Sequence, residues 1–331
     1  MPFGEKKLIQ QIRSLAPRGS SLVTGIGDDC AVLRVPPGYE LLVTTDFTIE
    51  NVHFRREWHP PELVGRRCLT RGLSDIAAMG GEPRAAFLSL AVASDVAQKW
   101  VDRFLKGLLD LAKEHKVPLA GGDTAQSAGG IQADIVVVGS VPKGKAVLRS
   151  GAKPGEQIYV TGELGGAAAA LARLRESKPA GGKDSGHVSR GFSRSSRGFG
   201  APQARVAVGQ SLRRRGWASA MIDLSDGLST DLEHICQESH VGAEIEAEAI
   251  PRAQDEDGQG KKRVALALAL HGGDDYELLF TSAIAVPAQI AGVRVTRIGR
   301  IVRSRTMRLI TTDGKPQPLE AGGWEHFRGK S

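Results

Sequence analysis

The residues of this sequence best suited to chemistry are aspartates that follow short apolar segments. Seven of them lie on five separate turns or segment ends: Asp28, Asp29, Asp46, Asp75, Asp123, Asp223 and Asp226. One Gly-Asp-Asp is ordinary turn chemistry, but the repeated pattern supplies the oxygen ligands that Mg²⁺ ions and phosphate groups require. Nearby hydroxyls add hard oxygen ligands at Thr44, Thr45 and Ser225. The set predicts a metal-dependent site that handles phosphate groups.

Three candidate residues keep alternative interpretations at this point. Asp75 is expected inside a helix, where it either coordinates a cation or faces solvent. His53 is either a ligand contact or a structural histidine. Arg149 either neutralises a nucleotide phosphate or forms a salt bridge.

Hydrophobic periodicity and the proline and glycine positions predict the elements of an N-terminal domain over residues 1–148. Pro60-Pro61 begins a helix that stops at Gly80-Gly81, and Asp95 caps a second, long helix. The first strand is expected over residues 41–45, ending at Asp46, and others over 83–92 and 131–141. These elements show no tight βαβ spacing, which favours an α+β domain.

A second domain, of mixed α/β type, is expected over residues 149–331. It has a strand at 157–162, a helix at 165–174 whose Gly165-Gly166 start a phosphate could approach, and a strand ending at Asp223. Residues 177–200 are dense in Gly, Ser and Arg and predict a mobile insertion. The insertion could contact RNA through its arginines or be a solvated loop.

Composition narrows the class of protein. The 331 residues are 41% hydrophobic, contain no apolar run long enough to span a bilayer, and begin without a secretory h-region. The three cysteines are far apart in sequence and predict reduced thiols rather than disulfides or a zinc site. We therefore expect a cytoplasmic, metal-dependent protein.

The net charge of +7 does not indicate a nucleic-acid-binding face. Residues 173–215 carry 11 Lys/Arg and 2 Asp/Glu, a net charge of +9, so the rest of the chain is slightly acidic. Binding of nucleic acid is not expected. The sequence has no GxxxxGK[ST], dinucleotide fingerprint or nucleophile elbow. The aspartate set fits phosphoryl transfer from a nucleotide best, because that transition state needs charge neutralisation and in-line placement more than a covalent nucleophile.

Seven motifs together resemble those of the thiamine-monophosphate kinases, in order and over nearly the whole chain. They are Gly25–Ala31, Thr44-Thr45-Asp46 with Asn51 and His53, Leu73–Gly80, Gly121–Thr124, Arg149–Gly155, Ile222–Gly227 and Gly272–Leu278. The resemblance implies ATP-dependent conversion of thiamine phosphate to thiamine diphosphate. It also implies a fold like that of aminoimidazole ribonucleotide synthetase, in which the N-terminal domain forms a barrel across a homodimer.

The resemblance also assigns roles residue by residue. The implied Mg²⁺ ligands are Asp29, Thr44, Thr45, Asp46, Asp75, Asp123, Asp223 and Asp226. The implied nucleotide contacts are Gly122, Arg149 and Ser225, and the implied substrate contacts are His53, Asp274 and Trp324. A monovalent cation is a further possible cofactor. Asp274 stands where Glu is expected, and residues 177–200 replace a compact connection.

Two other functions compete with this interpretation. One is another ATP-dependent enzyme of the same fold. Against it, the chain lacks the reactive Cys and Lys of selenophosphate synthetase, the C-terminal Cys of the hydrogenase-maturation dehydratase, and the sequence pattern of the ribonucleotide enzyme. The other is a non-catalytic nucleotide- or RNA-binding protein that uses the arginine-rich insertion.

Overall fold

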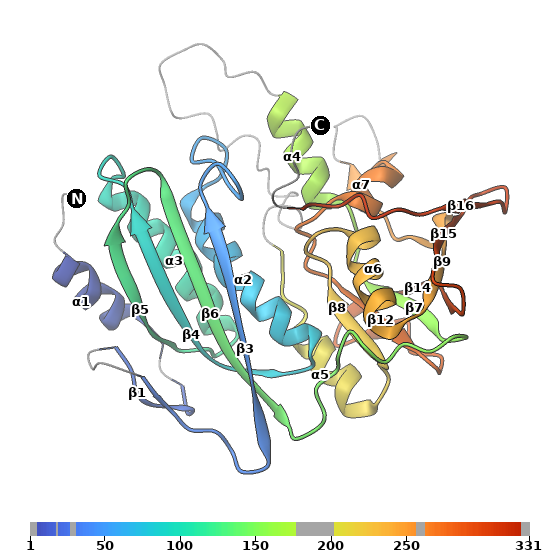
Figure 1. Cartoon of the computed structure of the whole chain (residues 1–331). Coiled ribbons are helices and arrows are strands. Elements are labelled where there is room, and N and C mark those ends of the chain that lie inside the picture. Colours follow the sequence, from blue (N-terminus) through green and yellow to red (C-terminus); the bar gives the residue numbers. More distant parts are fainter. Residues whose placement is uncertain (1–4, 18, 27–30, 177–201, 256–261, 326–331) are drawn as a thin grey trace. The chain divides into compact units, whose positions relative to one another are not determined.

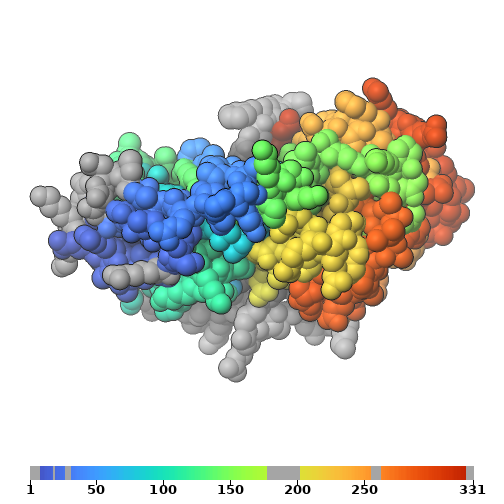
Figure 2. Space-filling model, turned by 90° about the horizontal axis from the view of Figure 1, so that it is seen from below, coloured from blue at the N-terminus to red at the C-terminus, as the bar shows by residue number. Residues whose placement is uncertain are grey.

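A computed structural model describes residues 5–17, 19–26, 31–176, 202–255 and 262–325 (Figure 1). The chain divides into two compact units. Residues up to 145, except 77–80, form most of the first unit, and residues 146–176 and 202–325 belong to the second. Segments coloured yellow to red in Figure 2 all belong to the second unit.

The first unit is built on a four-stranded sheet of order β3-β6-β4-β5. β6 pairs antiparallel with β3 and β4, whereas β4 and β5 are parallel. The strands are β3 (Tyr39–Ile49), β4 (Glu82–Val92), β5 (Leu119–Gln126) and β6 (Ile131–Pro142). The other elements are α1 (Glu5–Leu15), β1 (Leu22–Thr24), β2 (Val32–Leu33), α2 (Pro61–Ala78) and α3 (Gln98–Glu114).

Three sequence expectations about this unit are wrong. The first strand does not end at Asp46, because β-branched Thr48 and Ile49 prolong it and its pairing with β6 continues to Ile49. Asp123 likewise lies within β5 and not on a turn. The parallel pair β4 and β5 is joined through α3, so the unit does contain one βαβ crossover.

Glycines let the helices approach each other and the sheet closely. A Cβ on Gly107 of α3 would stand 1.9 Å from the carbonyl oxygen of Glu62 in α2, and one on Gly65 would stand 1.9 Å from that of Phe104. A Cβ on Gly72 of α2 would meet Val137 of β6 at 2.5 Å. The backbones of α2 and α3 are therefore in contact, and α2 lies close to β6 at Gly72.

The second unit is built on a larger sheet of order β16-β15-β9-β14-β7-β12-β8, with β13 paired to β14. Its strands are β7 (Gln157–Thr161), β8 (Ala220–Asp223), β9 (Gly242–Glu246), β12 (Leu278–Ser282), β13 (Gln289–Ile290), β14 (Val293–Val302), β15 (Met307–Ile310) and β16 (Pro316–Pro318). A short separate ribbon joins β10 (Gln254–Asp255) to β11 (Lys262–Arg263).

Helices complete the core of the second unit. Leu228, Leu232 and Ile235 of α6 are buried in one apolar cluster with Ile158 and Val160 of β7. The helices are α4 (Gly166–Glu176), α5 (Val206–Arg215), α6 (Leu228–Ser239) and α7 (Leu266–His271), with a 3₁₀ turn at Ala247–Ala249. Within the described residues no helix is long and apolar enough to cross a membrane.

The close contact of α2 and α3 leads to a prediction about the stability of the fold. Gly107→Ala places a methyl group against the backbone of Glu62, and we expect the free energy of unfolding to fall by about 1–3 kcal/mol. Gly129→Ala is the matched control, because a Cβ there meets no atom within 4 Å. Urea denaturation followed by tryptophan fluorescence compares the two variants. Equal midpoints for them would contradict the backbone contact.

Candidate active site

The first unit brings together three of the residues predicted as metal ligands. Thr44 and Asp46 lie two residues apart on β3 and therefore on the same face of the sheet, beneath α2. The hydroxyl of Thr44 donates a hydrogen bond to Oδ2 of Asp75 in α2. Arg71, one turn earlier in α2, lies 3.4 Å from Oδ1 of Asp46. A hydroxyl and two carboxylates on facing elements are a donor set that suits Mg²⁺.

Thr45 is separated from this group by strand geometry. Successive side chains of a strand point to opposite faces, so Thr45 lies on the other side of the sheet from Thr44. Its hydroxyl donates to Oδ1 of Asp134 on the neighbouring strand at 2.7 Å. The side chain of Thr45 therefore does not join that of Asp75.

Gly122 and Asp123 line a pocket of about 570 Å³ along β5. Gly25, Ile26 and Ala31, which flank the Gly-Asp-Asp turn, line the same pocket. Asp28 and Asp29 themselves lie outside the described residues. Gly122 has a φ of +146°, and a Cβ there would stand 1.8 Å from the carbonyl oxygen of Leu88. Only glycine fits at this close approach of β5 to β4.

Asp46 and Asp123 cannot bind one metal ion within a single chain. β3 and β5 are the two edges of the sheet, and Asp46 aligns across β6 and β4 with Gly122, next to Asp123. Three spacings between neighbouring strands separate them by about 14 Å. The predicted set therefore forms at least two groups in the first unit.

His53 lies on the loop that connects β3 to α2. The backbone N–H of Ile49 donates to its Nδ1 at 3.0 Å, and its own N–H donates to the carbonyl of Ile49 at 2.9 Å. Because Nδ1 accepts a hydrogen bond, the ring proton of this tautomer is on Nε2. The half-buried His53 thus carries an N–H donor of the kind that binds a phosphate oxygen.

The second unit holds a group of carboxylates where β8 meets α6. Asp223 ends β8 and is 3% exposed, and Asp226 follows in the turn. The buried Asp231 of α6 accepts the backbone N–H groups of Asp226 at 3.2 Å and Gly227 at 3.0 Å. Burial, then the charges of Asp223 and Asp226, raises the pKa of Asp231 to about 8. A bound cation would relieve this repulsion, so the group fits a metal.

Asp231 and His234 are residues that the sequence interpretation missed. Ligand atoms of Asp226, Asp231 and His234 all lie within 4.8 Å of one another. Their spacing in the sequence could have indicated them, because positions 231 and 234 share one face of the helix that follows the Asp-Leu-Ser-Asp-Gly turn.

The two predicted substrate contacts of this unit adjoin the same turn. The backbone N–H of Asp274 donates to the carbonyl of Ser225 at 2.8 Å, and that of Trp324 donates to the carbonyl of Asp226 at 3.0 Å. The hydroxyl of Tyr276 donates to Oδ1 of Asp274 at 2.8 Å. The indole-bearing Trp324 is 50% exposed. An exposed aromatic face and a carboxylate therefore stand beside Asp226.

Hydrogen bonds to Ser239 hold the backbone around Arg149. Its carbonyl accepts a hydrogen bond from the hydroxyl of Ser239 at 3.0 Å, and the same hydroxyl accepts the N–H groups of Gly151 and Ala152 at 3.1 Å. Ser239 thus fastens the segment after the N-terminal unit to the end of α6. The side chain of Arg149 is exposed.

The start of α4, where a phosphate was expected to be able to approach, already holds a carboxyl group. Asp275 accepts the N–H of Gly165 at 2.8 Å, and burial raises the pKa of its carboxyl to about 8. Two residues on, the buried Glu277 pairs with Arg205 and accepts the hydroxyl of Thr161 at 2.5 Å. These two acids of the Gly-Gly-Asp-Asp-Tyr-Glu motif are bound inside the unit, whereas Asp274 accepts the hydroxyl of Tyr276 beside the turn after β8.

Family models match both units of the chain. Residues 27–141 match the AIR synthase related protein, N-terminal domain, and residues 153–310 match the AIR synthase related protein, C-terminal domain. This confirms the predicted two-domain fold. A hydrogenase maturation protein HypE in complex with ATP shares the fold, with a TM-score of 0.74 at 17% identity over 98% of this chain and 95% of that chain.

Relatives with higher identity are thiamine-monophosphate kinases. The Escherichia coli K12 enzyme is 38% identical over 92% of this chain and 91% of its own length, and the Bacillus subtilis 168 enzyme is 34% identical over 96% and 98%. The crystal structure of the Stenotrophomonas maltophilia K279a enzyme has a TM-score of 0.79 at 32% identity, covering 95% of this chain and 98% of that chain.

A solved structure of AaThiL complexed with AMPPCP and TMP has a TM-score of 0.72 at 31% identity, covering 98% of this chain and 97% of that chain. Together with the curated relatives, it extends the similarity over both units. The chain therefore belongs to the thiamine-monophosphate kinase family.

Proposed function

We propose that this protein transfers the γ-phosphoryl group of ATP to thiamine phosphate, forming thiamine diphosphate and ADP. The observation that carries the proposal is the turn after β8, where Asp274 and Trp324 are held by backbone hydrogen bonds beside Asp223 and Asp226. Substrate-type and metal-type side chains thus adjoin in one unit. The name of the curated relatives and a relative solved with AMPPCP and TMP support the same reaction.

The chemistry is a direct in-line displacement. A phosphate oxygen of thiamine phosphate bonds to the γ-phosphorus while the bond from that phosphorus to the oxygen of ADP breaks. Mg²⁺ bound to the phosphates would supply the charge neutralisation that this transfer needs. In the first unit we assign Thr44, Asp46 and Asp75 to holding Mg²⁺. In the second unit we assign the same role to Asp223 and Asp226.

The remaining assignments follow from the type of each side chain. Gly122 lets a nucleotide approach the backbone of β5, and the guanidinium of Arg149 neutralises a nucleotide phosphate. Nε2–H of His53 donates to the phosphate of the substrate. The indole of Trp324 and the carboxylate of Asp274 suit a cationic thiazolium ring. No residue is assigned as a covalent nucleophile.

We further propose that the protein is a homodimer through the open face of the first sheet. Alternate residues of β3 expose large apolar side chains on the face opposite α2: Leu41 is 51% exposed, Val43 66% and Phe47 58%. Exposed apolar residues at alternate positions of a strand are typical of an interface. On this face Thr45, bound to Asp134, lies between Val43 and Phe47. The cytoplasmic location and the use of a monovalent cation stay predictions.

The reaction is tested with purified protein, ATP, Mg²⁺ and thiamine phosphate. Asp46→Asn removes a proposed metal ligand, and we expect kcat/KM to fall at least about 100-fold. Asp110→Asn is the control, because its carboxylate pairs with Lys106 on the exposed side of α3. Binding of Mn²⁺, followed by electron paramagnetic resonance, should weaken in the first variant alone. Failure of the wild-type protein to form thiamine diphosphate would disprove the proposed reaction.

The RNA-binding alternative makes the opposite prediction about residues 177–200. If the protein is a kinase, replacing this segment by a short Gly/Ser linker leaves formation of thiamine diphosphate near the wild-type rate. If the segment is the functional element, the replacement abolishes function and Asp46→Asn is silent. Steady-state kinetics of the two variants decide between them.

The dimer is tested by light scattering after gel filtration. Val43→Glu places a charge in the centre of the apolar face, and we expect the measured mass to shift towards that of one chain, 35.2 kDa. Ile284→Glu is the control, because Ile284 is 52% exposed but belongs to the second unit. A wild-type protein that already has the mass of one chain would contradict the interface.

A further inference from the structure

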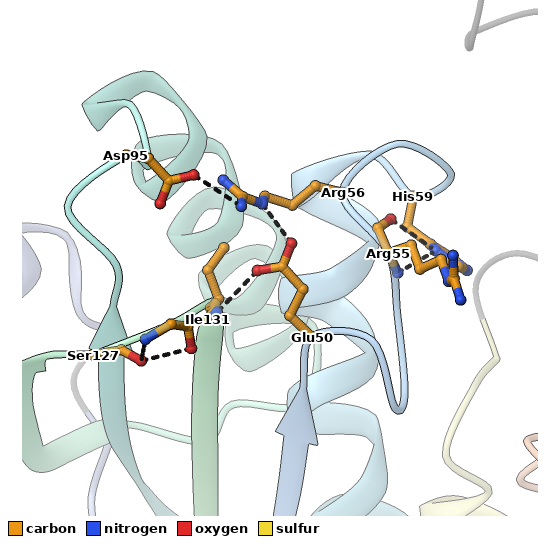
Figure 3. Close-up of polar contacts among 8 residues, drawn as sticks. Glu50, Arg55, Arg56, His59, Asp95, Ser127 and Ile131 are labelled. Atoms are coloured by element: carbon orange, nitrogen blue, oxygen red, sulfur yellow. Dashed lines mark hydrogen bonds and ion pairs between the residues drawn. The ribbon is translucent and has the colours of Figure 1, made fainter. Parts of the chain in front are cut away.

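The loop of residues 50–59, between β3 and α2, is organised by one buried carboxylate. Glu50 is only 8% exposed, and its Oε2 accepts the backbone N–H of Ile131 at 2.9 Å (Figure 3). Its own N–H donates to the carbonyl of Ile131 at 2.9 Å. Both the backbone and the side chain of Glu50 therefore bind the first residue of β6.

Arg56 supplies the charge that this carboxylate needs. Its Nε donates to Oε1 of Glu50 at 2.5 Å, and its Nη2 donates to Asp95 at 3.0 Å (Figure 3). Burial opposes the charge of Arg56, but the bonds to the two carboxylates raise its pKa. Asp95 was expected to cap α3, yet the residue at that cap is Ala97, without a side-chain bond. The loop is thus tied to both β6 and the approach to α3.

The loop has an apolar anchor beside the ion pair. Phe54 is 5% exposed and stacks on Trp100 of α3 with ring centroids 6.1 Å apart. The N–H of Asn51 donates to the carbonyl of Phe54 at 2.7 Å and closes a tight turn in which Asn51 has a φ of +67°. His53 lies inside this turn, next to the anchor.

Glu50 lies directly after Ile49, the residue whose backbone holds both the N–H and Nδ1 of His53. A shift of the chain at position 50 would therefore change where Nε2–H of His53 points. A buried carboxylate without its partner is costly, so the ion pair with Arg56 keeps Glu50 in this buried place. The network fixes one position of the loop.

We infer that Glu50 and Arg56 are positioning residues that hold His53 for the phosphate of thiamine phosphate. The inference rests on the proposed function, since it assigns the loop to that substrate. It concerns the phosphate acceptor and not the nucleotide. The network should therefore affect the two substrates differently.

The test compares steady-state kinetics of Arg56→Gln with those of the wild-type protein. We expect KM for thiamine phosphate to rise about tenfold with KM for ATP unchanged, because a displaced contact group weakens binding of its own ligand. Arg56→Lys, which keeps the charge, should recover part of the loss. Glu50→Gln combined with Arg56→Gln should cost less than the sum of the two single changes. Hydrogen exchange of the amides of residues 51–59 should speed up in Arg56→Gln.

Arg66→Gln is the matched control. Arg66 pairs with Glu114 at 2.7 and 2.8 Å between α2 and α3, in the same unit but on neither end of the loop. This variant should leave both KM values unchanged. An active wild-type protein whose Arg56→Gln variant loses thermal stability without a change in KM for thiamine phosphate would overturn the inference alone. A wild-type protein that forms no thiamine diphosphate would overturn the proposed function as well.

Discussion

Holding carboxylates close together, despite burial and mutual repulsion, is a constraint that the second unit shows most clearly. In the first unit, Asp75 accepts a hydrogen bond from the hydroxyl of Thr44, and Asp46 lies beside Arg71. In the second, Asp231 takes two backbone N–H groups and still has its pKa raised to about 8. These local partners let the acids stay in place. At Asp231 they do not fully offset burial and the charges of Asp223 and Asp226, which favours a cation there.

Rigid scaffolding holds the acids against that repulsion. Gly65 and Gly107 bring the backbones of α2 and α3 into contact, and Gly72 brings α2 close to the side chain of Val137 in β6. In the second unit, Ser225 and Asp226 offer backbone carbonyls to two segments that are distant in sequence. Acids placed on mobile loops would move apart, whereas acids placed on packed elements cannot. The arrangement is typical of sites in which geometry is set before the ligand binds.

The acids of the Gly-Gly-Asp-Asp-Tyr-Glu motif have different partners although they are close in sequence. Asp275 caps α4, and Glu277 is neutralised by Arg205 inside the unit. Asp274 has a positive φ of 67° and is bound by the hydroxyl of Tyr276. Its shorter side chain, where the resemblance implies Glu, is therefore held by a neighbour that also belongs to the motif. The sequence alone does not distinguish these three acids, because all are polar residues in one Gly-rich run.

The sequence by itself determined the family and the two-domain fold, because motifs and hydrophobic periods are local properties of the chain. The residues that it predicts for the site stay a prediction. The sequence also placed α2, β4, β6 and β8 within a few residues. Only the tertiary structure decided which residues meet. It put Asp46 and Asp123 on opposite edges of the sheet, and Asp95 on Arg56 instead of at a helix end. Such pairings depend on strand order and packing between distant segments, which no local pattern encodes.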